Sequence, residues 1–124
     1  MPSIDDASVA VALGANQPSA AGSPRETLVA VRPLLEELLK AWSAQELVYR
    51  WSSLHDTAPV GGPPDQPHYC NAVMLVEGLQ ARPSVAASLE LLDALQGLEQ
   101  QFGRNRSQEQ RWGARSLDLD LLFW

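Results

Sequence analysis

The sequence is poor in cysteine and in basic residues, and it has no long apolar run. Its single cysteine, Cys70, excludes an internal disulfide framework. Nine basic residues against fifteen acidic ones give a formal net charge of −6, which argues against general binding to nucleic acid or to an anionic membrane. No segment approaches the roughly 18 consecutive apolar residues of a membrane span. Asp5 and Asp6 stand where a signal peptide carries positive charge. These absences predict a soluble, cytoplasmic protein.

Several common site motifs are also missing. The chain contains no G-x-x-x-x-G-K-S/T, G-x-G-x-x-G, H-E-x-x-H or C-x-x-C sequence, which argues against Walker nucleotide hydrolases, dinucleotide enzymes and ordinary zinc sites. The spacing of His55 and His68 does not favour a metal site, and Cys70 has no third partner for nucleophilic catalysis. We expect Cys70 to be a small buried hydrophobe.

What is present suits one folded domain. The chain has 124 residues, of which 45% are apolar and 19% charged, an ordinary balance for a domain that can bury a core. Alternating apolar residues predict strands, and apolar residues three and four apart predict helices. The predicted strands are Ser8 to Ala15, Glu46 to Ser53, Tyr69 to Glu77 and Leu117 to Phe123; the predicted helices run from Ser23 to about Ala41 and from Ser88 to Phe102.

The order of these elements predicts an α+β fold. Strand, helix, two strands, helix and strand is the ferredoxin-like arrangement, a four-stranded sheet with two helices on one face. Pro33 should bend or break the first helix, because it removes one hydrogen bond and clashes with the preceding turn. Leu54 to His68, with Gly61 to Pro64, is expected to be a long functional loop.

The last predicted strand carries two aspartates. Because side chains alternate along a strand, Asp118 and Asp120 share one face, opposite Leu117, Leu119 and Leu121. Paired carboxylates suit Mg²⁺, which is usually completed by water and phosphate oxygens. The alternative is an ordinary solvated strand face.

Arginines immediately precede the aspartates. Arg104, Arg106, Arg111 and Arg115 are four of the nine basic residues, and the guanidinium fork matches phosphate oxygens. Arginines beside paired aspartates favour binding of a polyphosphate. The alternative is that the arginines only balance the charge of nearby carboxylates. Trp112, among them, either stacks on a base or covers the sheet edge.

Two further pairs are candidates. Gln96 and Glu99 share a helix face and either contact a nucleotide or are plain solvent-facing residues. Tyr69 and Asn71 share a strand face and suit a flat heterocycle, unless Asn71 only bonds loop backbone.

Six sequence blocks run in one order along nearly the whole chain. They are A-L-G-A-N (Ala12 to Asn16), T-A-P-V-G (Thr57 to Gly61), D-Q-P-H-Y-C-N-A (Asp65 to Ala72), L-L-D-A-L-Q-G-L-E (Leu91 to Glu99), F-G-R-N-R (Phe102 to Arg106) and R-W-G-A-R-S-L-D-L-D-L-L-F (Arg111 to Phe123). On these blocks the chain resembles the 6-hydroxymethyl-7,8-dihydropterin pyrophosphokinase family of folate biosynthesis.

The resemblance implies transfer of a pyrophosphoryl group from ATP, as co-substrate, to the pterin's hydroxymethyl oxygen, with AMP released. It implies that two Mg²⁺ ions are held by Asp118 and Asp120 and that Arg104 and Arg115 contact phosphate during catalysis. The implied nucleotide-binding residues are Gln96, Glu99, Arg106, Arg111, Trp112 and Leu121. The implied pterin-binding residues are Thr57, Val60, Tyr69 and Asn71.

The chain departs from the family's pattern after the paired aspartates. Family members normally continue for a few dozen residues, whereas this sequence ends at Trp124. We therefore expect a single pyrophosphokinase-like domain, residues 1–124, that is monomeric and lacks the family's C-terminal segment. The alternative is a non-catalytic ferredoxin-like remnant that binds a nucleotide or a partner strand.

Overall fold

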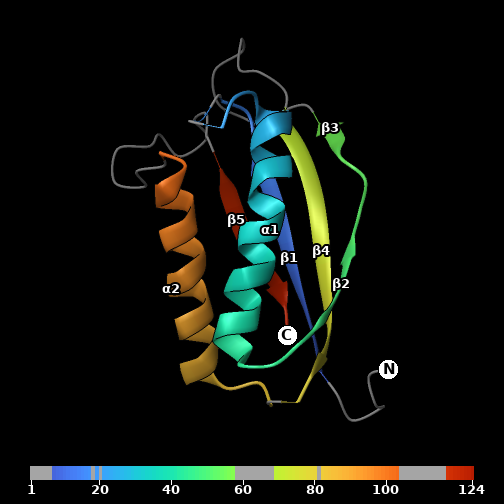
Figure 1. Cartoon of the computed structure of the whole chain (residues 1–124), viewed down its shortest axis with the longest axis vertical. Coiled ribbons are helices and arrows are strands. Elements are labelled where there is room, and N and C mark those ends of the chain that lie inside the picture. The colour runs from blue at the N-terminus through green and yellow to red at the C-terminus, as the bar shows by residue number, and fades with distance from the viewer. Residues whose placement is uncertain (1–6, 18, 20, 58–68, 81, 104–116) are drawn as a thin grey trace.

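The computed structural model describes residues 7–17, 19, 21–57, 69–80, 82–103 and 117–124. These residues form an α+β domain with two helices and a five-stranded sheet (Figure 1). In chain order the elements are β1 (Ala7–Ala15), α1 (Pro24–Ser43), β2 (Val48–Trp51), β3 (His55–Thr57), β4 (Tyr69–Leu79), α2 (Val85–Gln101) and β5 (Asp118–Phe123). The predicted α+β class is confirmed.

The sheet is antiparallel throughout, in the order β2-β4-β1-β5. The short strand β3 pairs with β4 beyond the end of β2, so both strands follow the same edge. Our expectation of four strands was wrong, because the segment predicted as a loop contains β3. The sequence His55–Thr57 lacks an apolar alternation and includes Asp56, so only its pairing with β4 makes it a strand.

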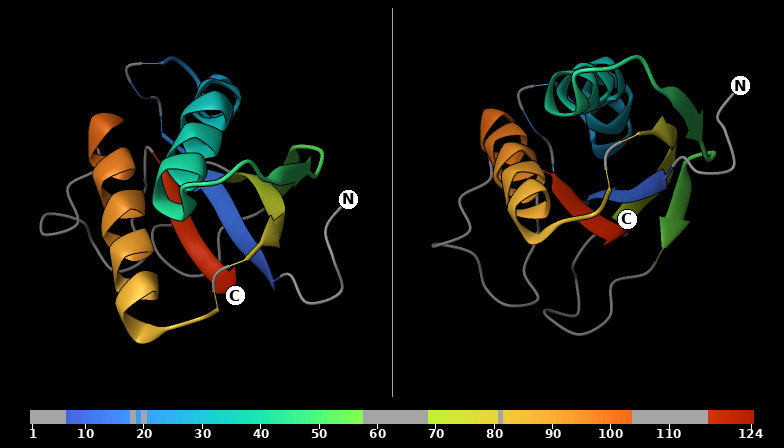
Figure 2. Two further views of the ribbon diagram at one scale, coloured as in Figure 1. Left: turned by 60° about the horizontal axis from the view of Figure 1, so that its bottom comes forward. Right: turned by 90° about the horizontal axis from the view of Figure 1, so that it is seen from below.

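Both helices cover the same face of the sheet (Figure 2). The core lies between the layers. The helices contribute Leu28, Val31, Leu35, Leu39, Leu91, Leu95 and Leu98, the strands contribute Val9, Val11, Leu13, Met74, Val76 and Leu119, and Leu117 joins them directly before β5. Alternation leaves Tyr69, Asn71 and Asp118 on the opposite face, where they are partly exposed. In the described part of the domain, one face of the sheet is therefore packed by helices and the other carries none.

Helix α1 begins with a capping box. The Ser23 side chain accepts from the Glu26 N–H, and Glu26 accepts from the Ser23 N–H at 3.1 Å. The helix runs unbroken through Pro33, so Pro33 does not break it, and the bend expected there stays a prediction. Pro33 and Val29 are both exposed, so the Val29 carbonyl that loses its intrahelical donor lies on the solvent side.

Side-chain bonds fix α1 against the sheet and against α2. Trp51 Nε1 donates to Glu36 Oε2 at 2.7 Å, and the Tyr49 hydroxyl donates to the Glu36 carbonyl at 2.9 Å. Trp42 Nε1 donates to the Ala87 carbonyl at 3.0 Å, which joins the two helices. These bonds hold the helical layer over the core.

Among the described residues, no helix combines the length and apolar character that a membrane crossing needs.

Candidate functional site

Strand pairing aligns four residues across the sheet. His55 lies opposite Asn71, Asn71 opposite Gly14, and Gly14 opposite Asp118. Neighbouring strands are about 4.8 Å apart, so Asn71 and Asp118 are separated by roughly 10 Å along this row. Asp120 lies two residues further along β5, opposite Ala12. The sheet thus brings the candidate residues Asn71 and Asp118, which are distant in sequence, to the same end of the sheet.

The two aspartates occupy the face that the sequence predicts. Leu117 and Leu119 are buried against the helices, whereas Asp118 is partly exposed and Asp120 is exposed. Leu121 is partly buried and packs against the core. The predicted alternation along β5 is therefore confirmed.

The carboxylate pair suits one kind of metal better than others. Within the described residues, no group of three or more His, Cys, Asp or Glu side chains could hold a metal ion. A site of two carboxylates fits Mg²⁺, which takes one or two carboxylates and completes its shell with water and substrate phosphates. It does not fit structural zinc, which takes four protein ligands.

The strand β4 places Tyr69 and Asn71 on the same face as the aspartates. Both are partly exposed, and the intervening Cys70 is buried. Burial raises the pKa of the Cys70 thiol, and the negative charge of Asp56 adds to this shift. The thiolate is the nucleophilic form, so a raised pKa does not favour nucleophilic chemistry. The prediction that Cys70 is a buried residue is confirmed.

Helix α2 contributes two residues in different environments. Gln96 is exposed, whereas Glu99 is only 1% exposed and accepts the Leu119 N–H at 2.7 Å. The alternative of a solvent-facing Glu99 is therefore wrong. The 3.6-residue helical period placed both side chains on one helix face but did not show how close β5 comes to Glu99.

Several predicted site residues lie outside the described residues. They are Val60, Arg104, Arg106, Arg111, Trp112 and Arg115. For Thr57 the structure gives the backbone, which pairs with Tyr69. The assignments to these residues stay predictions.

His55 in the row and Asn16 beside it were given no site role from the sequence. Asn16 is a buried polar residue directly after β1, and it belongs to the A-L-G-A-N block that contains Gly14. His55 lies opposite Asn71, and its ring contacts the Ser53 hydroxyl at 3.0 Å. The block marked Asn16, but no local pattern marked His55, because its place depends on the pairing of β3.

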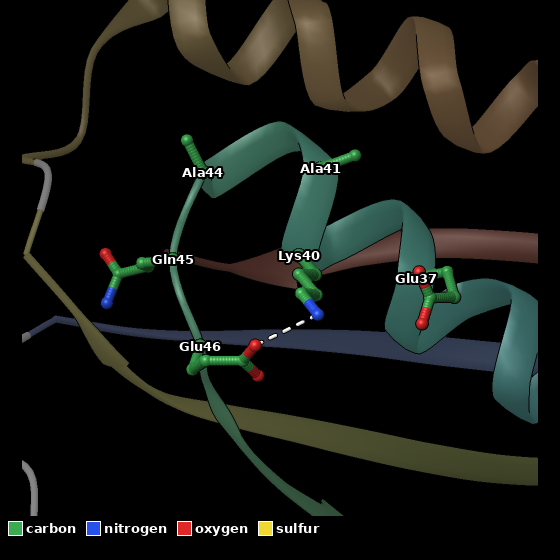
Figure 3. Close-up of a pocket in the computed structure, with 6 residues that line it drawn as sticks. All are labelled: Glu37, Lys40, Ala41, Ala44, Gln45 and Glu46. Carbon is green, nitrogen blue, oxygen red and sulfur yellow. Dashed lines mark ion pairs between the residues drawn. The ribbon is translucent and has the colours of Figure 1, made fainter.

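A hollow of about 450 Å³ lies elsewhere on the domain (Figure 3). Its lining includes Glu37, Gln45 and the ion pair between Lys40 and Glu46, whose Nζ and Oε1 atoms are 2.9 Å apart. It sits at the C-terminal end of α1, whereas the aligned row lies at the other end of the sheet. None of the candidate site residues that the structure describes lines it.

Comparison with known proteins connects this arrangement to one family. The sequence model of 7,8-dihydro-6-hydroxymethylpterin-pyrophosphokinase matches residues 10–124, which include every candidate site residue. The chain belongs to this pyrophosphokinase family. The resemblance inferred from the sequence blocks is confirmed.

Individual relatives support the same family assignment. The chain is 38% identical over 116 residues to the 2-amino-4-hydroxy-6-hydroxymethyldihydropteridine pyrophosphokinase of Pseudomonas aeruginosa, covering 94% of this chain and 60% of the relative. It is 39% identical over 114 residues to the enzyme of that name from Haemophilus influenzae, covering 92% and 60%. The chain thus spans about 60% of the length of these two pyrophosphokinases.

Proposed function

We propose that this family member transfers a pyrophosphoryl group from ATP to the hydroxymethyl group of 6-hydroxymethyl-7,8-dihydropterin, a step of folate biosynthesis. The hydroxyl oxygen attacks the β-phosphorus, the bond from that phosphorus to the α-phosphate oxygen breaks, and AMP leaves. The observation that carries the proposal is the row in which Asn71, Gly14 and Asp118 face one another on three strands. In this proposal a heterocycle site and a carboxylate site lie side by side, on the sheet face that carries no helix among the described residues.

We assign Asp118 and Asp120 the role of holding two Mg²⁺ ions against the ATP phosphates. Their exposure on one strand face supports this assignment. Bound Mg²⁺ would neutralise phosphate charge as transfer proceeds. Arg104 and Arg115 are proposed to neutralise further phosphate charge, because their guanidinium groups can donate two parallel hydrogen bonds.

The remaining proposed contacts divide between the two substrates. Tyr69 and Asn71, with Thr57 and Val60, would hold the pterin, because a ring and an amide together match a flat polar heterocycle. The proposed nucleotide contacts are Gln96, Arg106, Arg111, Trp112 and Leu121. Glu99 is buried and accepts the Leu119 N–H of β5, so it is not among them. Positioning both substrates in line and stabilising the phosphate charge together supply most of the acceleration in phosphoryl transfer, which needs little covalent help.

We also propose that the domain has the ferredoxin-like arrangement, extended by β3. The order β2-β4-β1-β5 and the two helices on one face support it. That the protein is monomeric and cytoplasmic remains our prediction from the sequence.

The experiment is an assay for AMP formation from ATP, Mg²⁺ and the dihydropterin. It compares the 124-residue chain with a chimera that adds the C-terminal residues of the Pseudomonas aeruginosa relative, because that relative is longer. Circular dichroism checks that both fold. AMP formed only with the pterin, by either protein, supports the proposal. No AMP from a folded chimera would instead favour a non-catalytic protein that binds a nucleotide or a partner strand.

A further inference from the structure

A buried glutamate on α2 contacts the strand that carries the two aspartates. Glu99 is only 1% exposed, and its Oε2 accepts the backbone N–H of Leu119 at 2.7 Å. Leu119 stands between Asp118 and Asp120, and its own side chain is buried in the core. The hydrogen bond therefore joins the end of a helix to the middle of the carboxylate pair.

The bond acts on the outer edge of β5. Leu119 pairs with Leu13 of β1, and in the described sheet β5 is the last strand of the order. Alternate residues of an antiparallel strand direct their N–H groups away from the neighbouring strand. The Leu119 N–H donates to Glu99 on that outer side. Strand β5 is therefore held by β1 along one edge and, at Leu119, by α2 along the opposite edge.

Burying a carboxylate as deeply as that of Glu99 is costly in free energy unless it is hydrogen-bonded. Glu99 lies close to the end of α2, where Leu95 and Leu98 are buried in the core. An apolar side chain would suit that packing but could not accept the Leu119 N–H. Anchoring the strand gives a physical reason for an acid at this position.

We infer that Glu99 is a positioning residue, which fixes the backbone at Leu119 and thereby sets the placement of Asp118 and Asp120 for a divalent cation. The inference rests on the proposed function for the cation itself. Glu99 accepts from β5 on the helix-covered side, whereas the two aspartates alternate with the buried leucines and face the other side. Support through Leu119 accounts for this geometry better than direct contact with a nucleotide.

Two conservative variants of Glu99 separate the effect of side-chain length from the effect of its charge. Glu99→Gln keeps the side-chain length and an acceptor oxygen but loses the charge. Glu99→Asp keeps the charge but is one methylene shorter, so it cannot reach Leu119 without a shift of helix or strand. Glu90→Asp, the same shortening at an exposed position of α2, is the matched control.

Two NMR measurements on the 124-residue chain and each variant are required. Amide hydrogen exchange of Leu119 reports the anchoring bond, and a titration with Mg²⁺ alone, followed at the amides of Asp118 and Asp120, reports metal affinity. We expect Glu99→Asp to speed Leu119 exchange about tenfold, as loss of a hydrogen bond to a charged group implies. We expect it to weaken Mg²⁺ binding roughly tenfold, as loss of a supporting group around a metal site does.

We expect Glu99→Gln and Glu90→Asp to stay close to the wild-type protein in both measurements. Equal behaviour of Glu99→Gln and Glu99→Asp, or a larger loss in Glu99→Gln, would overturn the inference. If the wild-type protein binds no Mg²⁺, the proposed metal site fails. The anchoring role is then decided by Leu119 exchange: acceleration in Glu99→Asp alone supports it, and equal rates refute it.

Discussion

Gly14 leaves room for the side chain of Asn71 on the neighbouring strand. A Cβ atom added at position 14 would lie 3.1 Å from Asn71 Oδ1, and Tyr69 Cδ1 would be its next neighbour at 3.8 Å. Since Gly14 also pairs with Asp118, it separates the proposed pterin contacts from the proposed metal ligands. Because Gly14 has no side chain, the Asn71 carboxamide can lie against the backbone of β1.

We predict that Gly14→Ala lowers the free energy of unfolding by about 1 kcal/mol, the smaller end of the cost of overpacking. The Asn71 carboxamide must give way by a few tenths of an ångström, so pterin affinity should also fall. Urea unfolding and a pterin titration measure the two effects.

The matched control is Gly97→Ala, because a Cβ at that helical position meets nothing within 4 Å. This change should instead stabilise the protein by about 0.5–1 kcal/mol. Similar stability changes in the two variants would contradict the close approach of Gly14 and Asn71.

The capping box of α1 predicts a dependence of stability on pH. Hydrogen bonds from Ser23, the backbone N–H above all, hold the pKa of Glu26 below its usual value of 4.5. A group with a lower pKa in the folded state stabilises fully above its unfolded pKa, and this contribution is lost as the pH falls through the folded value. Glu26→Gln, which resembles the protonated acid, should therefore destabilise the protein at pH 7 but much less at pH 3. Urea unfolding at both pH values tests this, and a constant difference would contradict it.

The two arginines proposed to act in catalysis give a kinetic prediction. If Arg104 and Arg115 neutralise charge that develops during transfer, replacing either with alanine lowers kcat by more than it weakens nucleotide binding. Single-turnover AMP formation and an equilibrium nucleotide titration separate the two effects. Arg82→Ala, at an exposed position before α2, should change neither. A raised dissociation constant with unchanged kcat would contradict the catalytic role.

The sequence predicted the features that depend on local pattern. Alternation along β5 predicted the shared face of Asp118 and Asp120, and a helical start at Ser23 followed from its cap and from Pro24. The start of α2 was placed too late, at Ser88 instead of Val85, because the capping residue Ser84 was overlooked.

The features that depend on distant pairing were beyond local reasoning. No periodicity could place His55 opposite Asn71, or Gly14 between Asn71 and Asp118, because these relations come from the register of separate strands. The burial of Glu99 was missed for a related reason. A helix pattern shows which residues share a face, but not which backbone group of a remote strand one of them will reach.

The central claim is that Asp118 and Asp120 bind a metal-nucleotide complex, and calorimetry with a non-hydrolysable ATP analogue tests it most directly. Titrations with and without Mg²⁺ are compared for the wild-type chain, Asp118→Ala and Asp120→Ala. The account predicts Mg²⁺-dependent binding by the wild type and loss of the Mg²⁺-dependent part in each variant, because water replaces a carboxylate ligand only poorly beside phosphate charge. Equal nucleotide binding by all three proteins in the presence of Mg²⁺ would contradict it.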